Sequence, residues 1–227
     1  MGSALSTLRS IVENQLDTGS TDTTTDPTST LLNSYINTSI RRIARRDKPR
    51  ELKSATVTEA NITINTNTVS IPTTILLPDL VYYTTSSGSI YRVIYRDLKK
   101  MIQQVPQKDF FDSTKTGDPA YYDTRGTSLI FNTHFDRTES NAIKIYGVDV
   151  PTTLSLDTDT TELPSDYDYL IAYEVCILFY QRDDDVQNQL KFQELARLEK
   201  AHLRVSLDLD TDTTITMDPK VYGTGNS

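Results

Sequence analysis

Cysteine, tryptophan and histidine are almost missing from this chain of 227 residues, which has one cysteine, no tryptophan and two histidines. The single cysteine, Cys176, excludes a framework of internal disulfides. It lies in an apolar run without a basic neighbour to lower its pKa, so we expect a buried thiol and not a nucleophile. His134 and His202 lie far apart in the sequence, and neither has neighbours at metal-ligand spacing. We therefore expect no metal site built on these residues.

Long hydrophobic runs are missing as well. No run reaches the ~20 apolar residues that span a bilayer. The first residues, MGSALSTLRSIVENQ, lack the charged and apolar regions of a secretory signal, so we expect an intracellular, soluble protein. Hydrophobic residues make up 37% of the chain, which is low for a compact monomer of this length. Part of its order is therefore expected to come from partners.

Signatures of catalysis are also missing. The sequence has no P-loop, no dinucleotide-binding fingerprint and no nucleophile elbow. Asp183, Asp184 and Asp185 could suggest Mg²⁺ or Ca²⁺, but consecutive side chains on a helix point about 100° apart. The spaced oxygens and turn glycine of an EF-hand are missing too, so we interpret the three aspartates as a solvated break in a helix. We expect no enzyme and no cofactor.

Acidic residues outnumber basic ones by 31 to 23, which gives a net charge of −8. Binding to duplex nucleic acid is driven by neutralisation of phosphates, so this balance argues against general DNA binding.

The two ends of the chain carry apolar residues at helical spacing. In the first helix these are Leu5, Leu8, Ile11, Val12 and Leu16. Hydroxyl or carboxylate side chains lie at the expected starts of the later helices, where they can cap the helix or place a negative charge in its first turn. The pattern predicts helices over residues 4–17, 29–47, 165–182 and 186–206.

Between these helices the apolar period changes to two, with many Thr, Val, Ile and Tyr residues. Strands are predicted at 61–72, 79–85 and 89–95, two more within 121–133, and one at 141–150, with a hairpin turn at 86–88 and a short helix at 97–105. The predicted fold class is therefore α+β: a four-helix core with a small antiparallel β insert at about 60–150 and an extended C-terminal arm. We expect one domain over residues 1–206 and the arm over 207–227.

The third predicted helix is apolar on every side, since Glu174 is the one polar residue between Tyr169 and Tyr180. Such a helix must be buried all round, and at about twelve residues it is too short for a membrane. The other predicted helices can cover part of it. The remainder implies a neighbouring subunit or a very central position.

Basic residues gather at the end of the second predicted helix, where residues 41–53 contain seven basic and two acidic side chains. They are either the solvated face of an amphipathic helix or an electrostatic patch for an acidic partner, a protein rim or a passing nucleic acid. The sequence alone leaves both interpretations open.

The arm alternates polar and apolar residues in a way that is typical of strands from Thr213 to Met217. Such a segment can add to a sheet edge or lie in a groove of another subunit. A tail without a binding role is the alternative.

Several short motifs follow one another in order along the chain. They are N-x-[AS] at 37–39 before an isoleucine and arginines, a strand ending in a proline within 68–80, R-V-x-Y-x-x-L at 92–98, G-x-P-x-x-Y at 117–122 and L-S-x-D-x-D-x-x-x-L-P at 154–164. In this order and spacing, residues 4–205 resemble the adaptor, or head-to-tail connector, family of tailed bacteriophages. The family usually has a tryptophan after the second helix and a proline pair after the second strand, where this chain reads DKPREL and NTHFDRT.

The resemblance implies a structural protein of the virion neck, made in the host cytoplasm. Adaptors of this family form a ring, usually of twelve copies, that docks under the portal, extends the DNA channel and presents a platform to the tail. The implied partners are the portal protein, further copies of the chain, the tail or next neck protein, and genomic DNA that passes without sequence-specific binding; no membrane is involved. The residues expected to make the ring and partner contacts are Arg41, Arg42, Arg45, Arg46, Ile215, Met217, Val221 and Tyr222.

Two other functions remain open at this point. One is a different neck component, such as a stopper or tail-completion protein, although these usually have fewer helices. The other is a non-catalytic nucleic-acid-binding module that uses the arginines and would bind DNA in a salt-sensitive way.

Overall fold

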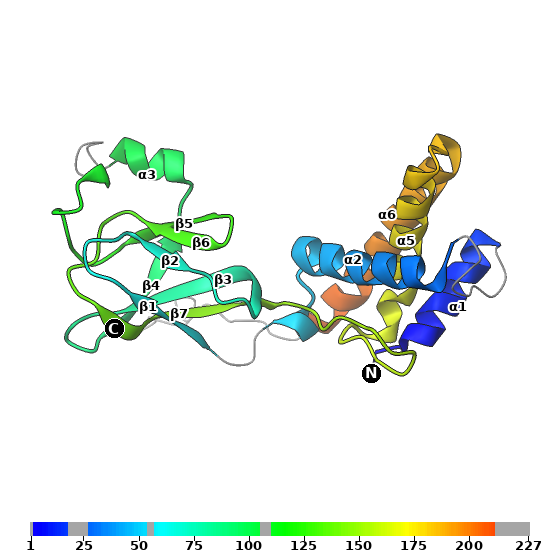
Figure 1. The fold of residues 1–227 in the computed structure, drawn as a ribbon, viewed down its shortest axis with the longest axis horizontal. Helices are drawn as coiled ribbons and strands as arrows, with labels where there is room; N and C mark the ends of the chain where they lie inside the picture. Colours follow the sequence, from blue (N-terminus) through cyan, green and yellow to red (C-terminus); the bar gives the residue numbers. More distant parts are fainter. Residues whose placement is uncertain (1, 18–26, 54–56, 105–109, 212–227) are drawn as a thin grey trace, which may run out of the picture. The chain divides into compact units, whose positions relative to one another are not determined.

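The computed structural model describes residues 2–17, 27–53, 57–104 and 110–211. The described residues fall into two compact units (Figure 1): one combines the chain up to Ser39 with the chain from Thr153 onward, and the other runs from Ile40 to Thr152. We call them the helical unit and the sheet unit. Helix α2 (Ser29–Asp47) contributes its first part to the helical unit and its last part to the sheet unit.

The helical unit contains α1 (Leu5–Leu16), the first part of α2, the short 3₁₀ helix η2 (Ser165–Tyr167), α5 (Asp168–Arg182) and α6 (Val186–Thr211). These helices lie close to the bounds that the apolar period predicted. The last one differs, because it continues to Thr211 where a helix to 206 was expected. None of the helices in the described ranges is long and apolar enough to cross a bilayer.

Helix α5 is the centre of this unit, since α1 and α6 both pack against it. One side of its first turns is fully buried, as Leu170, Ile171 and Val175 show. The side chains of residues 177–180 are only half-buried, however, and Tyr169 is 52% exposed. The expectation of burial on every side is therefore not met within the single chain, because Tyr169 in the first turn and residues 177–180 near the end are partly open to solvent.

The described part of the sheet unit contains seven strands, the end of α2, one further α-helix and a 3₁₀ helix. The strands are β1 (Thr58–Ile62), β2 (Thr68–Ser70), β3 (Ile75–Thr84), β4 (Ile90–Tyr95), β5 (Tyr121–Arg125), β6 (Ser128–Phe131) and β7 (Glu139–Asp149). Helix α3 (Leu98–Gln104) lies between β4 and β5, and the 3₁₀ helix η1 (Arg50–Leu52) precedes β1. The strand order is β1-β7-β3-β4-β5-β6-β2, and β4 pairs with β5 in parallel while the other pairs are antiparallel.

The sheet curves until it is nearly closed, because β1 and β2, at the two ends of the strand order, contact each other. Its interior is an aromatic core of its own. The Tyr83 and Phe135 rings stack with centroids 6.2 Å apart, and Phe131 meets Phe135 edge-on at 5.3 Å. All three rings are fully buried.

The predicted fold class is therefore wrong. The structure has five α-helices in its described part and a seven-stranded, mixed, barrel-like sheet instead of a four-helix core with a small antiparallel insert. The expected strand at 61–72 is in fact β1 and β2, separated by a turn in which Asn65 has φ +62°. The α3 crossover makes β4 and β5 parallel. A period of two predicts strands but carries no information about closure, which depends on pairing between distant segments.

Candidate assembly surfaces

The four arginines predicted to make contacts form one exposed surface on the last part of α2. Arg41 and Arg45 are four residues apart, as are Arg42 and Arg46, so their positive charges are neighbours on the helix surface. Arg46 also forms an ion pair with Asp47 at 3.1 Å. The opposite face of this helix is apolar and buried. We call the four arginines the basic strip; their role in binding remains a prediction.

A groove opens beside the basic strip. It has a volume of about 490 Å³, and Arg45 forms one of its walls. The rest of the lining comes from the end of β2, the start of β3 and the segment between them, from the β5–β6 turn and from the residue after β7. Its apolar members include Ile71, Pro72, Leu76 and Val150. We call it the Arg45 groove. It combines apolar surface with positive charge at its edge.

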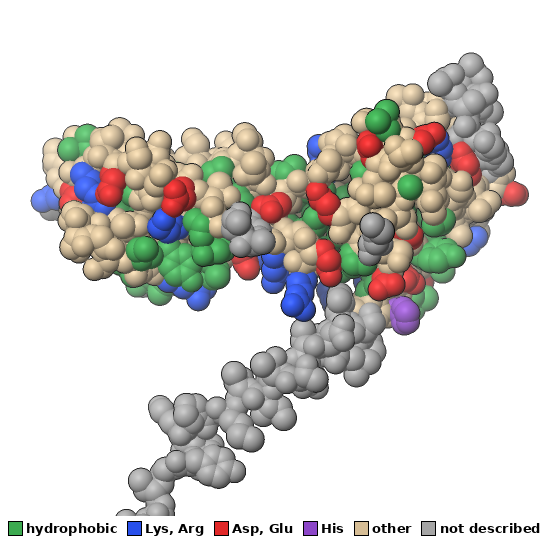
Figure 2. Space-filling view, turned by 90° about the horizontal axis from the view of Figure 1, so that it is seen from below, with side chains coloured by type: hydrophobic (Ala, Val, Ile, Leu, Met, Phe, Trp, Pro, Cys, Tyr) green, Lys and Arg blue, Asp and Glu red, His purple; other side chains and the backbone are tan. Residues whose placement is uncertain are grey.

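A second groove lies on the outer face of the sheet. Tyr82 and Tyr146 meet there edge-on, with ring centroids 6.0 Å apart, beside the 55% exposed side chain of Ile90. Lys53 and Lys144 are also part of its lining, and its volume is about 480 Å³. Figure 2 shows apolar side chains next to Lys and Arg side chains on the sheet unit. We call this the Tyr82 groove.

The three aspartates lie in the turn between α5 and α6, where each has a different structural role. Asp183 forms an ion pair with Arg182 at 2.7 Å. Asp184 has a left-handed backbone with φ +55° and an exposed side chain. Asp185 caps α6, because its carboxylate accepts hydrogen bonds from the backbone N–H (3.1 Å) and side-chain amide (2.7 Å) of Asn188. The first of these bonds lowers the pKa of Asp185 most.

Large apolar side chains are exposed directly after this turn. Val186 is 61% exposed and Leu190 is 59% exposed, and the two lie one helical turn apart on α6. They follow the half-buried last turn of α5, where Tyr180 stacks on Phe192. We call the surface formed by Asp183, Asp184, Val186 and Leu190 the α5–α6 end. It is acidic and apolar at once.

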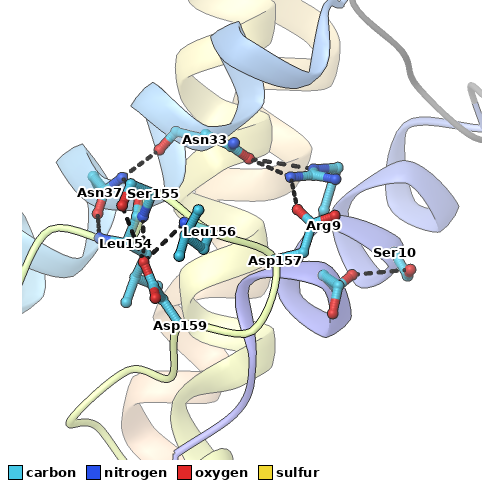
Figure 3. A network of polar contacts seen from close by, with 10 residues as sticks. Arg9, Ser10, Asn33, Asn37, Leu154, Ser155, Leu156, Asp157 and Asp159 are labelled. Carbon is cyan, nitrogen blue, oxygen red and sulfur yellow. Dashed lines mark hydrogen bonds and ion pairs between the residues drawn. The ribbon is translucent and has the colours of Figure 1, made fainter.

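The motif residues of the helical unit form a polar network (Figure 3). Asn37 on α2 makes two hydrogen bonds with the backbone of Leu154. The carboxylate of Asp159 accepts hydrogen bonds from the N–H groups of Ser155 (2.7 Å) and Leu156 (2.8 Å). These bonds lower the pKa of Asp159, with the bond from Leu156 the largest cause. The network holds the 154–159 loop against α2, so these motifs shape the fold.

Arg9 connects α1 to the same network. Its guanidinium donates to the side-chain oxygen of Asn33 at 3.0 Å and to Asp157 at 2.8 Å. Both aspartates of the L-S-x-D-x-D motif therefore have structural contacts, one across to α1 and one within its own loop.

The histidines and the cysteine lie in separate places. His134 is buried in the sheet unit, whereas His202 is exposed on α6, 3.9 Å from Glu199. Cys176 is buried in α5, and burial raises its pKa to about 12, which keeps it protonated at neutral pH. Within the described ranges, no group of three or more His, Cys, Asp or Glu residues could hold a metal ion.

The other half of the predicted contact set lies outside the described residues: Ile215, Met217, Val221 and Tyr222. Conversely, sequence reasoning missed both grooves and the exposed apolar residues of the α5–α6 end. The grooves arise where distant segments meet, and no local pattern indicates them. Val186 and Leu190 have helical spacing in the sequence, but spacing does not show whether the face that they form is covered.

Residues 4–218 match a protein-family model described as SU10 adaptor protein. No curated protein matches the chain.

Proposed function

The chain belongs to the SU10 adaptor protein family, a family of phage head-to-tail adaptors, and from this membership we propose that it forms a ring between portal and tail. It is thus a structural adaptor protein of a bacteriophage, which implies a place in the virion and contacts with other head or tail proteins. In our proposal the ring, of about twelve copies, docks under the portal, extends the DNA channel and carries the tail or next neck protein. Its role there is structural and not catalytic.

The family match over residues 4–218 is the observation that carries this proposal. The basic strip supports it, because four arginines are exposed on a chain with a net charge of −8. Positive charge concentrated on one helix favours an acidic protein surface as partner, and long-range attraction speeds such an encounter. In a ring, each such contact is repeated in every copy, so modest contacts add up to stable docking.

The C-terminal arm has a role in the same proposal. The arm of each copy binds to a neighbouring subunit or to the portal through Ile215, Met217, Val221 and Tyr222, with its backbone supplying hydrogen bonds. A chain ending at Thr211 keeps all of α6 and removes these four residues, so it tests the arm without shortening a described helix.

Light scattering on the chain, alone and mixed with the portal protein of the same phage, tests the proposal. We expect a monomer of 25.6 kDa or a weak oligomer alone, and a ring of copies on the portal. Reversal of the strip by Arg42→Glu and Arg46→Glu should weaken docking in a salt-dependent way. Lys99→Glu with Lys100→Glu, on the exposed face of α3, is the control with the same change in charge.

Failure of the wild-type chain to associate with the portal at any salt concentration would contradict the proposal. The same samples, titrated with duplex DNA, test the nucleic-acid alternative, which predicts tight binding that falls steeply with salt. The adaptor proposal predicts little binding to DNA.

A further inference from the structure

The two units of the chain carry opposite net charges. Residues 40–152, which form the sheet unit, contain 16 Lys and Arg against 12 Asp and Glu, a net charge of +4. The remaining residues contain 7 against 19, a net charge of −12. Figure 2 shows acidic side chains over the helical unit. Two helical units therefore repel each other, whereas the helical unit of one copy attracts the sheet unit of another.

The α5–α6 end has the features of one half of an interface. Val186 and Leu190 expose apolar surface on the same side of α6, and the half-buried last turn of α5 lies next to them. Contiguous exposed apolar surface with a charged edge marks a contact site more often than scattered apolar residues do. Asp184 supplies a negative edge, next to the ion pair of Asp183 with Arg182.

The Arg45 groove has the complementary features. Ile71, Pro72 and Leu76 give it an apolar lining, and Arg45 brings the positive charge of the basic strip to its wall. An apolar helix end with an acidic edge matches an apolar groove with a basic edge in both respects. The match places an apolar contact at the centre and charge pairs at the rim, as is typical of specific interfaces.

We propose that the α5–α6 end of one copy docks in the Arg45 groove of the next copy. This inference deepens the proposed function, because it assumes that the chain assembles with itself, and it names the two surfaces that meet. Val186 and Leu190 enter the groove, while Asp183 and Asp184 face the basic strip. The contact joins two different surfaces, so repetition of it produces a closed ring or an open filament and not a symmetric dimer.

Disulfide trapping between separate chains tests this contact even if it is weak. One chain carries Leu190→Cys, and a second, tagged chain carries Thr73→Cys at an exposed position in the groove lining. The control chain carries Ser87→Cys on the exposed β3–β4 turn of the same unit. The native Cys176 is buried with a pKa raised to about 12, so it does not compete as a thiolate.

We expect the Leu190→Cys and Thr73→Cys chains to form a mixed disulfide dimer at a yield at least about tenfold above the control, since a specific contact raises the local concentration of the two thiols. A yield equal to the control would overturn the inference. So would a predominance of dimers between two Leu190→Cys chains, because these require two acidic ends to meet. Efficient capture by a cysteine placed in the Tyr82 groove, at Ile90, would move the docking site there and also overturn it.

Charge reversal distinguishes this specific contact from non-specific association. Arg42→Glu and Arg45→Glu on the Thr73→Cys chain should lower the mixed yield to the control level, and Asp183→Lys with Asp184→Lys on the Leu190→Cys chain should restore it. A yield that stays low when both chains are reversed would contradict the pairing. If trapping fails while the wild-type chain still forms a ring on the portal, this inference falls and the proposed function stands. If trapping succeeds but the chain does not bind the portal, this inference stands and the proposed function falls.

Discussion

The side-chain amide of Asn37 makes both possible hydrogen bonds with the backbone of Leu154. Its Nδ2 donates to the Leu154 carbonyl oxygen at 2.9 Å, and its Oδ1 accepts from the Leu154 N–H at 2.8 Å. The side chain on α2 thus makes the pair of hydrogen bonds to a backbone N–H and C=O that a neighbouring strand would make. The loop that it binds lies 117 residues further along the chain. Ser39, two residues on, is fully buried, so that position admits only a small side chain. The N-x-[AS] motif therefore has a structural explanation.

Replacement of Asn37 should destabilise the fold. Asn37→Ala leaves the N–H and the carbonyl of Leu154 without these partners, and we expect a loss of about 1–3 kcal/mol in the free energy of unfolding. Thr38→Ala is the matched control, because the Thr38 hydroxyl is exposed and bonds only to Ser34 of its own helix. Urea unfolding of both variants measures the difference. Equal midpoints for the two would show that the Leu154 contact contributes nothing.

Asp159 should make stability depend on pH. Its pKa in the folded protein is lower than its ordinary value of 3.8, because its carboxylate accepts hydrogen bonds from Leu156 and Ser155. Its contribution is therefore complete at pH values above 3.8 and is lost as the pH falls through the folded pKa.

Asp159→Asn removes the titration while keeping the shape of the side chain. We expect the variant to unfold at lower urea concentration than the wild type near neutral pH, and the difference to disappear at acidic pH. A difference in urea midpoint that stays constant across this pH range would refute the assignment.

The α5–α6 turn offers two substitutions with opposite expected signs. Asp184 has φ +55°, a region that glycine adopts without steric cost, so Asp184→Gly should stabilise the turn by up to about 1 kcal/mol. Asp185→Ala removes the cap of α6 and should cost about 0.5–2 kcal/mol. Thermal unfolding with circular dichroism measures both. Two shifts of the same sign would contradict the roles that the structure assigns to these neighbours.

Sequence reasoning succeeded where structure is local. The helical spacing of Leu5, Leu8 and Val12 predicted α1, and these residues are buried in the structure. The same reasoning treated the aspartates of the α5–α6 turn as one solvated break, because a composition of three acids does not distinguish an ion pair, a left-handed turn residue and a helix cap. Those roles depend on the backbone conformation of each residue.

Closure of the sheet could not be predicted because it depends on pairing between distant segments. Thr58 of β1 pairs with Ile145 of β7, and Thr68 of β2 pairs with Ile130 of β6. Alternation within one strand defines its two faces but not its neighbours. The Arg45 groove has the same origin, since its walls come from α2, from the β2–β3 region, from the β5–β6 turn and from the end of β7. Of the candidate site, the sequence therefore showed the arginines and not the groove beside them.

Helix α5 separates stability from assembly. Val175 is fully buried, so Val175→Asp places an unpaired charge in the core, which costs several kcal/mol and is enough to unfold a domain of ordinary stability. The sequence alone predicts the same outcome for Ile177→Asp, since both residues lie in one apolar run.

In the structure Ile177 is only half-buried, and the carboxylate of the Ile177→Asp variant can reach water. We therefore expect Ile177→Asp to keep the fold with a modest loss of stability but to weaken association with further copies, because Ile177 lies about one turn before the end of α5, near the α5–α6 end. Asn14→Asp, at an exposed position on α1, is the control for an added carboxylate and should change neither property. Circular dichroism melting and light scattering with the portal protein measure the two properties separately. If Ile177→Asp unfolds the chain as Val175→Asp does, this part of α5 belongs to the core of the single chain; if it leaves both properties unchanged, this part is neither core nor interface.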